Sequence, residues 1–346
     1  MSQRDPHQSG ESSPLSLSRR RLLTGGLAAG LTGGLLTGLA ASGFAFSTLA
    51  AQAAAPLAGI SQPGALRRRL GEFEITALLD GYLELGPDLI IGYDPAIGEP
   101  LRAAAFATGP AMRGPVNAFL LNTGDKLVLI DAGTSDKMGP TFGHLPKALA
   151  AAGVTPEQID AVLITHMHPD HIYGVLTPGG LPMFPNAELL LPEADHAFWY
   201  DDAALNAAPE MMKGFFLGAR QAADAYAKRQ TRFKAGEEVL PGITALAMPG
   251  HTPGHSGLRI DSDGQSLLVL ADVVHVPALQ FARPEWSVAF DVDPALAAET
   301  RKKVLDMASA DGVMVAGMHL GFPGFGHVAR DGEAYRYVAA SWPYAG

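Results

Sequence analysis

The sequence predicts an α/β fold in which strands alternate with helices. Hydrophobic residues make up 47% of the 346-residue chain, which is enough for a sizeable core, and its 40 glycines and 26 prolines are typical of a protein with many loops. Short apolar runs bounded by turn residues alternate with longer helical patterns. Histidines and aspartates follow directly after several of the apolar runs. This arrangement favours a layered fold with an active site along one sheet edge.

The first 55 residues have the pattern of an export signal. The arginines at 19–21 precede an apolar, glycine-rich stretch, and no further charged residue occurs before Arg67. Small residues around Ala53 fit a cleavage site. We therefore expect export by the twin-arginine machinery to the periplasm or the medium, with cleavage of 1–55. An uncleaved membrane anchor is the alternative, because the segment is long enough to span a bilayer.

Composition excludes several kinds of site. The chain has no cysteine, so disulfides, thiolate metal ligands and a cysteine nucleophile are all excluded. Its net charge of −10 opposes binding to nucleic acid or to anionic lipid. We therefore expect a small-molecule substrate, and any metal must be held by histidine, aspartate or glutamate.

Apolar patterning places the main elements within a single domain at 72–346, which follows an arm or linker at 56–71. A turn is expected at Asp80-Gly81. The strand-forming stretches are 72–85, 116–133 (a hairpin), 161–165, 243–260, 266–274 and 313–320. The helical stretches are 140–153, 192–202, 209–230 and 294–312.

The stretch LITHMHPDHIYG concentrates side chains that can bind metal ions. His166, His168, Asp170 and His171 lie within six positions, directly after a buried strand pattern. In an extended loop the side chains of His166 and His168 point the same way, because side chains alternate. Asp170 and His171 can then turn to a neighbouring position. One short loop can thus supply ligands to two adjacent metal ions.

Three further candidate ligands follow apolar runs later in the chain, namely His251, Asp272 and His319. Together with the loop they make five histidines and two aspartates. Neutral imidazoles and carboxylates suit zinc and similar divalent ions. Asp272 is the natural residue to bridge two metals. The sequence therefore predicts a site for two divalent ions, which we expect to be zinc.

The order HxHxDH, GHTPGHS, a strand ending in aspartate and a strand ending in histidine resembles the metallo-β-lactamase superfamily. The stretch NAFLLNTGDKLVLIDAGT resembles the early hairpin of that fold, and the resemblance covers roughly 72–330. It implies a metallo-β-lactamase αββα four-layer sandwich. It also implies two groups of ligands with Asp272 between them: His166, His168 and His251, and Asp170, His171 and His319.

The stretches PALQF and HLGFPGFGHVARDGEAYRYV resemble the methyl parathion hydrolase branch and its related lactonases and aryl-ester hydrolases. That resemblance implies export, a two-metal centre and a homodimer. His275 and Phe290 each stand where methyl parathion hydrolase has leucine, and Ala271 replaces the usual glycine. The first two differences make the pocket more polar and change its shape. They favour a lactone or carboxylic ester over an aryl phosphotriester.

The resemblance also suggests roles for residues that bind no metal. Asp131 is expected to hold the metal-binding loops by hydrogen bonds, and His255 to support the ligands in the same way. His275 is either a substrate contact or a wall of the pocket. The residues expected to line the substrate pocket are Phe119, Trp199, Phe216, His275 and Phe290.

The expected activity is metal-dependent ester hydrolysis. A hydroxide shared by two metals attacks a lactone or aryl ester, Asp170 guides the water proton while it binds metal, and Asp272 bridges. These two aspartates are therefore the expected catalytic residues. Organophosphate triester hydrolysis stays open as a main or side activity. A β-lactamase and a non-hydrolytic metal-binding protein of the same fold are further alternatives.

Overall fold

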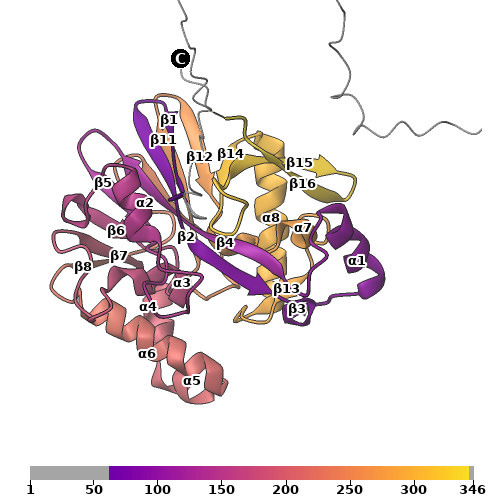
Figure 1. The fold of residues 1–346 in the computed structure, drawn as a ribbon, viewed down its shortest axis with the longest axis horizontal. Helices are drawn as coiled ribbons and strands as arrows, with labels where there is room; N and C mark the ends of the chain where they lie inside the picture. Colours follow the sequence, from indigo (N-terminus) through magenta and orange to yellow (C-terminus); the bar gives the residue numbers. More distant parts are fainter. Residues whose placement is uncertain (1–61, 343–346) are drawn as a thin grey trace, which may run out of the picture. The chain divides into compact units, whose positions relative to one another are not determined.

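Two seven-stranded sheets pack against each other in residues 62–342, the part of the chain that the computed structural model describes (Figure 1). The predicted export segment at 1–55 lies outside the described residues. No helix among residues 62–342 is long and apolar enough to cross a membrane.

The first sheet combines an antiparallel half with a parallel half. β5 through β8 run parallel to one another, whereas β1, β2, β4 and β5 pair antiparallel. Its strands, in spatial order, are β1 (Ala65–Leu70), β2 (Phe73–Leu85), β4 (Met112–Asn122), β5 (Leu127–Ile130), β6 (Ala161–Leu163), β7 (Glu188–Pro192) and β8 (Gln230–Phe233).

The second sheet is antiparallel except where β12 pairs with β14. Its strands, in spatial order, are β16 (Ala334–Ala339), β15 (Phe325–Asp331), β14 (Met314–Ala316), β12 (Gln265–Val269), β11 (Ser256–Ser262), β10 (Ile243–Ala247) and β9 (Glu238–Leu240). A small ribbon pairs β3 (Ile90–Ile91) with β13 (Ser287–Val288).

Helices cover the outer faces of both sheets, as Figure 1 shows for α2 and α8. Side chains of α2, α4 and α6 pack on the first sheet, and those of α8 pack on the second. The helices are α1 (Pro95–Ala104), α2 (Leu145–Ala151), α3 (Pro169–Ile172), α4 (Glu193–Trp199), α5 (Asp202–Ala207), α6 (Glu210–Asp224), α7 (Pro277–Gln280) and α8 (Pro294–Asp311). The layer order is helix, sheet, sheet, helix, which confirms the predicted αββα sandwich.

The alternation of side chains along β4 shows how the layers form. Ala118 and Leu120 belong to the core beneath the helices of the first sheet, whereas Phe119 and Leu121 face the second sheet. Successive side chains of a strand point to opposite faces, so a strand that is apolar at every position needs a layer on each side. The continuous apolar run of this strand therefore specifies an inner position in the sandwich.

The expected linker at 56–71 is wrong for its second half, because β1 forms the edge of the first sheet. Leu66 and Leu70 are buried, and the strand pairs with β2 in register from Ala65 opposite Leu78 to Leu70 opposite Phe73. The run of three arginines made this stretch look like a solvated linker. Charged side chains are, however, normal on an edge strand. The folded domain therefore begins before residue 72.

The expected turn at Asp80-Gly81 is a bulge within one long strand. The pairing of β2 with β4 shifts register between Leu79 and Gly81. The Asp80 side chain is fully buried and accepts hydrogen bonds from the backbone N–H groups of Thr134, Gly143 and Leu145. A bulge interrupts the regular alternation of side chains along a strand. Here it directs the Asp80 side chain toward the loop after β5, which that side chain anchors.

Parallel strands explain why chemically active residues meet. β5, β6 and β7 end at the same edge of the first sheet, and β12 and β14 end together in the second. Asp131 follows β5, His166 comes soon after β6, Asp272 lies just beyond β12 and His319 just beyond β14. The loops that carry these residues converge where the two sheets meet.

Candidate metal centre

The loop after β6 and the short helix α3 together carry four of the predicted ligands, and hydrogen bonds anchor the start of the loop. At its start the carboxylate of Asp131 accepts the backbone N–H and the hydroxyl of Thr165, each at 2.8 Å. His168 has extended backbone angles and precedes the first residue of α3. Asp170 and His171 lie in the first turn of this helix. The change from extended chain to helix explains how one loop supplies two neighbouring groups of ligands.

The structure brings all seven predicted ligands together in two groups with the membership expected from the sequence. The ligand atoms within each group lie within 4.8 Å of one another. The first group is His166, His168 and His251, and the second is Asp170, His171, Asp272 and His319. A third combination joins His251 and Asp272 to His275, which the sequence assigned to the substrate pocket.

One carboxylate oxygen lies at the centre of this arrangement. Imidazole nitrogens from five histidines surround Oδ2 of Asp272 at 2.9 to 3.7 Å. The contacts, in order of distance, are His319 Nε2 at 2.9 Å, His171 Nε2 and His275 Nε2 at 3.2 Å, His251 Nε2 at 3.4 Å and His166 Nε2 at 3.7 Å.

Hydrogen bonds on the far side of three rings fix which nitrogen faces the centre. Nδ1 of His171 lies 2.7 Å from the Asp131 carboxylate, and Nδ1 of His319 lies 2.8 Å from the carbonyl of Pro115. Nδ1 of His251 is bonded to a carboxylate in the same way. In a neutral imidazole that donates from Nδ1, the Nε2 atom carries a lone pair. When these rings are neutral, as metal ligands are, three lone pairs point at the oxygen of Asp272.

This set of side chains fits divalent metal ions. Lone pairs on nitrogen and oxygen repel each other at these distances unless positive charge lies between them. Nε2 of His166 and Oδ1 of Asp272 are buried without a hydrogen-bond partner in the described part of the chain. Cations that bind imidazole and carboxylate satisfy such atoms. The two groups of ligands could hold one ion each, with Asp272 shared between them.

Electrostatics keeps both aspartates of the centre ionised. Burial raises the pKa of Asp272 and of Asp170, but the neighbouring His171 and His319 outweigh it and lower both pKa values. For His251, burial lowers the pKa, because it disfavours the charged ring. Hydrogen bonds to Asp272 and Asp291 outweigh burial and raise the pKa to about 9. The centre is thus a negatively charged pair of carboxylates in a ring of imidazoles.

His255 supports Asp272 from behind. Its Nδ1 lies 2.7 Å from the carbonyl of Met248, and its Nε2 accepts the backbone N–H of Asp272 at 2.9 Å. Burial, with a smaller contribution from His251, lowers the pKa of His255 to about 3. The neutral ring therefore holds the backbone that carries Asp272 and offers no free nitrogen to a metal.

Sequence reasoning missed two aspartates that position the ligand loops. Asp195 accepts the backbone N–H groups of Met167 at 2.7 Å and Gly254 at 3.1 Å, and so links the two loops that supply His168 and His251. Asp291 is bonded to His251. The sequence around Asp195 and Asp291 gives no indication of this role, since neither residue lies in a histidine-rich motif. The occurrence of Asp195 just after a buried strand pattern was the one available hint.

Two of the predicted pocket residues line an apolar cavity beside the centre. Phe216 and Phe290 lie on the wall of a cavity of about 390 Å³, with Met212 and Val292. The Phe290 ring centroid is 5.3 Å from that of His275 and 6.1 Å from that of His251. The cavity therefore lies between α6 and the segment 289–292, and Phe290 of that segment packs against two histidines of the centre.

The other two phenylalanine and tryptophan residues predicted for the pocket, Phe119 and Trp199, do not line this cavity. Phe119 is fully buried between the two sheets, where its ring lies 5.3 Å from that of Phe325. Trp199 is also fully buried; its Nε1 donates to Asp195 at 2.9 Å, and its ring lies edge-on to His168 at 5.4 Å. Trp199 instead packs against a ligand.

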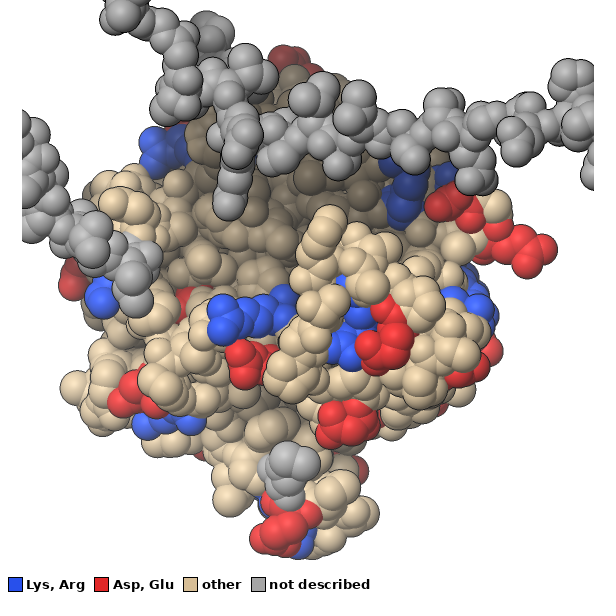
Figure 2. All heavy atoms as spheres, turned by 45° about the vertical axis from the view of Figure 1, so that its right-hand side comes forward, with Lys and Arg blue, Asp and Glu red and all other residues tan. Residues whose placement is uncertain are grey.

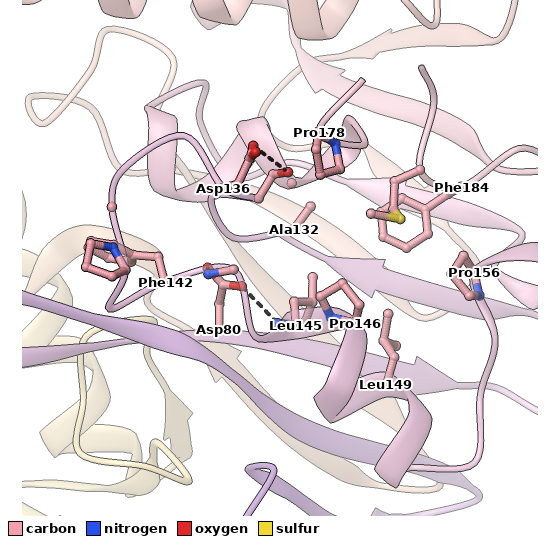
Figure 3. A pocket seen from close by; sticks show the side chains of 16 residues that line it. Asp80, Ala132, Asp136, Phe142, Leu145, Pro146, Leu149, Pro156, Pro178 and Phe184 are labelled. Atoms are coloured by element: carbon pink, nitrogen blue, oxygen red, sulfur yellow. Dashed lines mark hydrogen bonds between the residues drawn. The ribbon is translucent and has the colours of Figure 1, made fainter. Parts of the chain in front are cut away.

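A second cavity, of about 500 Å³, lies beside the loop after β5 (Figure 3). Asp80, Phe142 and Leu145 line it, whereas none of the seven ligands does. Figure 3 shows the hydrogen bond that commits the Asp80 carboxylate to Leu145. The Asp80 carboxylate is thus used to hold the loop, and the other polar side chains on the wall are those of Ser135 and Asp136.

Comparison with known proteins agrees with this geometry. The metallo-β-lactamase superfamily model matches residues 111–319. An N-acyl homoserine lactonase of Bacillus cereus is 25% identical over 221 residues, which cover 58% of this chain and 79% of that protein. The crystal structure of hydrolase AbOPH of the β-lactamase superfamily has a TM-score of 0.78 and 31% identity, covering 82% of this chain and 99% of that one. AidC, a dizinc quorum-quenching lactonase solved with the product N-hexanoyl-L-homoserine, has a TM-score of 0.75 and 26% identity, covering 81% and 98%. The chain belongs to the metallo-β-lactamase superfamily of metal-dependent hydrolases.

Proposed function

We propose that this protein hydrolyses lactones, and N-acyl homoserine lactones in particular, with two zinc ions bound at the centre. The observation that carries the proposal is the apolar cavity lined by Phe216 and Phe290, which suits an acyl chain and whose Phe290 also packs against His275 and His251. The relatives named as N-acyl homoserine lactonase and as a dizinc lactonase support the same class of substrate.

The residues of the centre fit the steps of ester hydrolysis. When bound, two divalent ions supply a water molecule of lowered pKa and positive charge for the carbonyl oxygen. The side chain of Asp170 is 12% exposed, more than that of any other predicted ligand, so its carboxylate is the one that solvent reaches most easily. It can accept the proton of the attacking water and return it to the alkoxide that leaves when the ring opens.

Asp170 stays ionised because His171 and His319 hold its pKa below the ordinary value. Phe290 stands beside His275 at the border between the ligands and the apolar cavity. A lactone ring bound at the centre would direct its acyl chain past Phe290 toward Phe216. The polar lactone ring would then lie at the metal centre, and the apolar acyl chain would lie in the apolar cavity.

An acyl-chain series tests the cavity. We expect kcat/KM of the parent protein to rise with chain length from N-butanoyl to N-decanoyl homoserine lactone, and Phe216→Ala to shift this dependence. Leu217→Ala is the matched control, since Leu217 is the next residue on α6 and is 59% exposed. Equal changes in both variants, or no dependence on chain length, would contradict the proposed acyl site.

A comparison of substrate classes tests the reaction. We expect kcat/KM for N-hexanoyl homoserine lactone or dihydrocoumarin to exceed that for methyl paraoxon by tenfold or more, about 1.4 kcal/mol of transition-state stabilisation. A faster phosphotriester reaction would assign the main activity to organophosphate hydrolysis. Lack of turnover of any of them by metal-loaded protein would remove ester hydrolysis from the proposal.

We also propose export by the twin-arginine pathway, with a small-molecule substrate and no nucleic acid partner. The arginines at 19–21 and the apolar stretch after them support export. The net charge of −10 supports the choice of substrate, and Figure 2 shows acidic and basic side chains intermixed on the face in view. Replacement of the three arginines by lysine should retain the protein in the cytoplasm.

We also propose a homodimer, as the resemblance implies, and light scattering of the purified protein tests it.

A further inference from the structure

His275 lies within the metal centre, closer to the shared carboxylate than two of the predicted ligands. Its Nε2 is 3.2 Å from Oδ2 of Asp272, the same distance as Nε2 of His171. The corresponding distances for His251 and His166 are 3.4 and 3.7 Å. By position, His275 is therefore equivalent to the histidines that the sequence pattern selected.

The ring of His275 has no other use for its nitrogens. Both Nδ1 and Nε2 are buried without a hydrogen-bond partner in residues 62–342, and the side chain is 1% exposed. A neutral imidazole offers one donor and one lone pair, and native proteins rarely leave such atoms unsatisfied when buried. This burial also disfavours a simple wall position, for which an apolar side chain would serve better.

Packing and backbone bonds fix the ring rigidly. It stacks on His319 with a centroid distance of 5.1 Å and an interplanar angle of 22°, and Phe290 meets its edge at 5.3 Å. Oε1 of Gln280 accepts the backbone N–H groups of His275 at 2.7 Å and of Val276 at 3.0 Å. The loop thus aims a free ring nitrogen at the centre without any hydrogen bond to the ring itself. Ligands that are positioned in advance are held in this manner.

We propose that His275 is an eighth metal-binding residue, whose Nε2 joins His251 and Asp272 in holding the ion of the first group. The three residues have ligand atoms within 4.8 Å of one another. This inference rests on the metal centre of the proposed function and extends it. It adds a further imidazole to the ion that His251 helps to hold. Imidazole ligands favour zinc over the harder ions magnesium and calcium.

Metal titration tests the assignment. The full chain is stripped with a chelator and titrated with Zn²⁺ and with Co²⁺ against a chromophoric competitor. We expect the parent protein to bind two equivalents, and His275→Phe to weaken one of the two stepwise constants by tenfold or more and to change the visible Co²⁺ spectrum. The matched control is Phe290→Leu, which alters packing on the same ring but removes no ligand atom. Its two constants should stay within twofold of the parent values.

Further measurements distinguish an error in the role of His275 from an error in the metal centre itself. His275→Ala with added imidazole should recover the parent Co²⁺ spectrum, and this arm also decides the question if the phenylalanine variant does not fold. Parent-like constants and spectra in His275→Phe, or no response of His275→Ala to imidazole, would overturn the inference while the two-metal centre stands. Absence of bound metal in the parent protein would instead refute the proposed function together with the inference.

Discussion

Nδ1 of His251 lies 2.7 Å from Oδ1 of Asp291, and both side chains are buried. The other carboxylate oxygen of Asp291 accepts the backbone N–H of Val288 at 3.0 Å. The imidazole therefore donates its Nδ1 proton to a carboxylate that is itself fixed, and it turns its Nε2 lone pair toward Asp272. A residue that offers no atom to the metals thus orients one of their ligands.

Asp291→Asn should weaken metal binding by about 10- to 100-fold, because an amide cannot accept both hydrogen bonds with two oxygens. Competition with a chromophoric chelator measures the change. Asp293→Asn is a suitable control: Asp293 caps α8 by accepting the N–H of Leu296, and asparagine caps a helix equally well. If both variants bind zinc with the affinity of the parent, the orienting role of Asp291 is wrong.

Removal of metal should lower the melting temperature. The Nε2 atoms of His171, His251 and His319 face the carboxylate of Asp272 at 2.9 to 3.4 Å, and ions bound among them stabilise the folded state because the unfolded chain does not hold these ligands together. Bound ions at 100 times their dissociation constant would contribute about 2.7 kcal/mol per site. Differential scanning calorimetry before and after chelation measures the shift, and zinc added back should reverse it. An unchanged melting temperature would mean that the centre does not depend on metal.

Gly174→Ala should destabilise the protein by about 1–3 kcal/mol through overpacking. A Cβ atom at this position would lie 1.7 Å from the carbonyl oxygen of Ala132, a backbone atom that cannot move away cheaply. The residue follows α3, so the strain would reach the loop that carries His171. Urea denaturation measures the loss.

Gly214→Ala is the matched control for that substitution. Gly214 is exposed on α6, and a Cβ atom there meets nothing within 4 Å. Alanine in a helix interior is more favourable than glycine by about 0.5–1 kcal/mol. The two variants should therefore change stability in opposite directions, and equal effects would contradict the packing of the ligand loop against Ala132.

His196 should make the protein less stable in mild acid. Burial and the nearby Arg232 lower its pKa, and the ring stacks on Tyr200 at 4.1 Å. The unfolded chain then binds more protons than the folded chain between the two pKa values. The free energy of unfolding therefore falls as pH drops below about 6.5. His196→Phe removes this titration, so the parent should lose stability relative to the variant between pH 7.5 and 5.5. A difference that does not change with pH would contradict the expectation.

Much of the fold and centre could be predicted from sequence because their signals are local. The hairpin of β4 and β5 and the helix α8 follow from apolar periodicity and turn residues, and all three elements are present. The ligands stand in short motifs next to apolar runs. Since parallel strands end at one sheet edge, such motifs can be expected to meet there.

What the sequence did not reveal depends on long-range packing. Periodicity identified Phe119 as apolar but gave no way to tell an inter-sheet core from a pocket wall, since both faces of β4 are apolar. The bulge at Asp80 requires partners more than 50 residues away. β15 and β16 pair with each other at the sheet edge, and their mixture of charged and aromatic residues conceals the alternation.

The proposed activity of this centre is hydrolysis of lactones with bound metal. The most direct measurement follows proton release during opening of N-hexanoyl homoserine lactone, since hydrolysis forms a carboxylic acid. Protein with two measured equivalents of zinc should turn over, whereas the chelated protein, His168→Ala and Asp272→Ala should show no turnover above background. Glu299→Ala, an exposed change on α8, should match the parent. Full activity in metal-analysed Asp272→Ala, or inactivity of the two-zinc parent, would contradict the central claim.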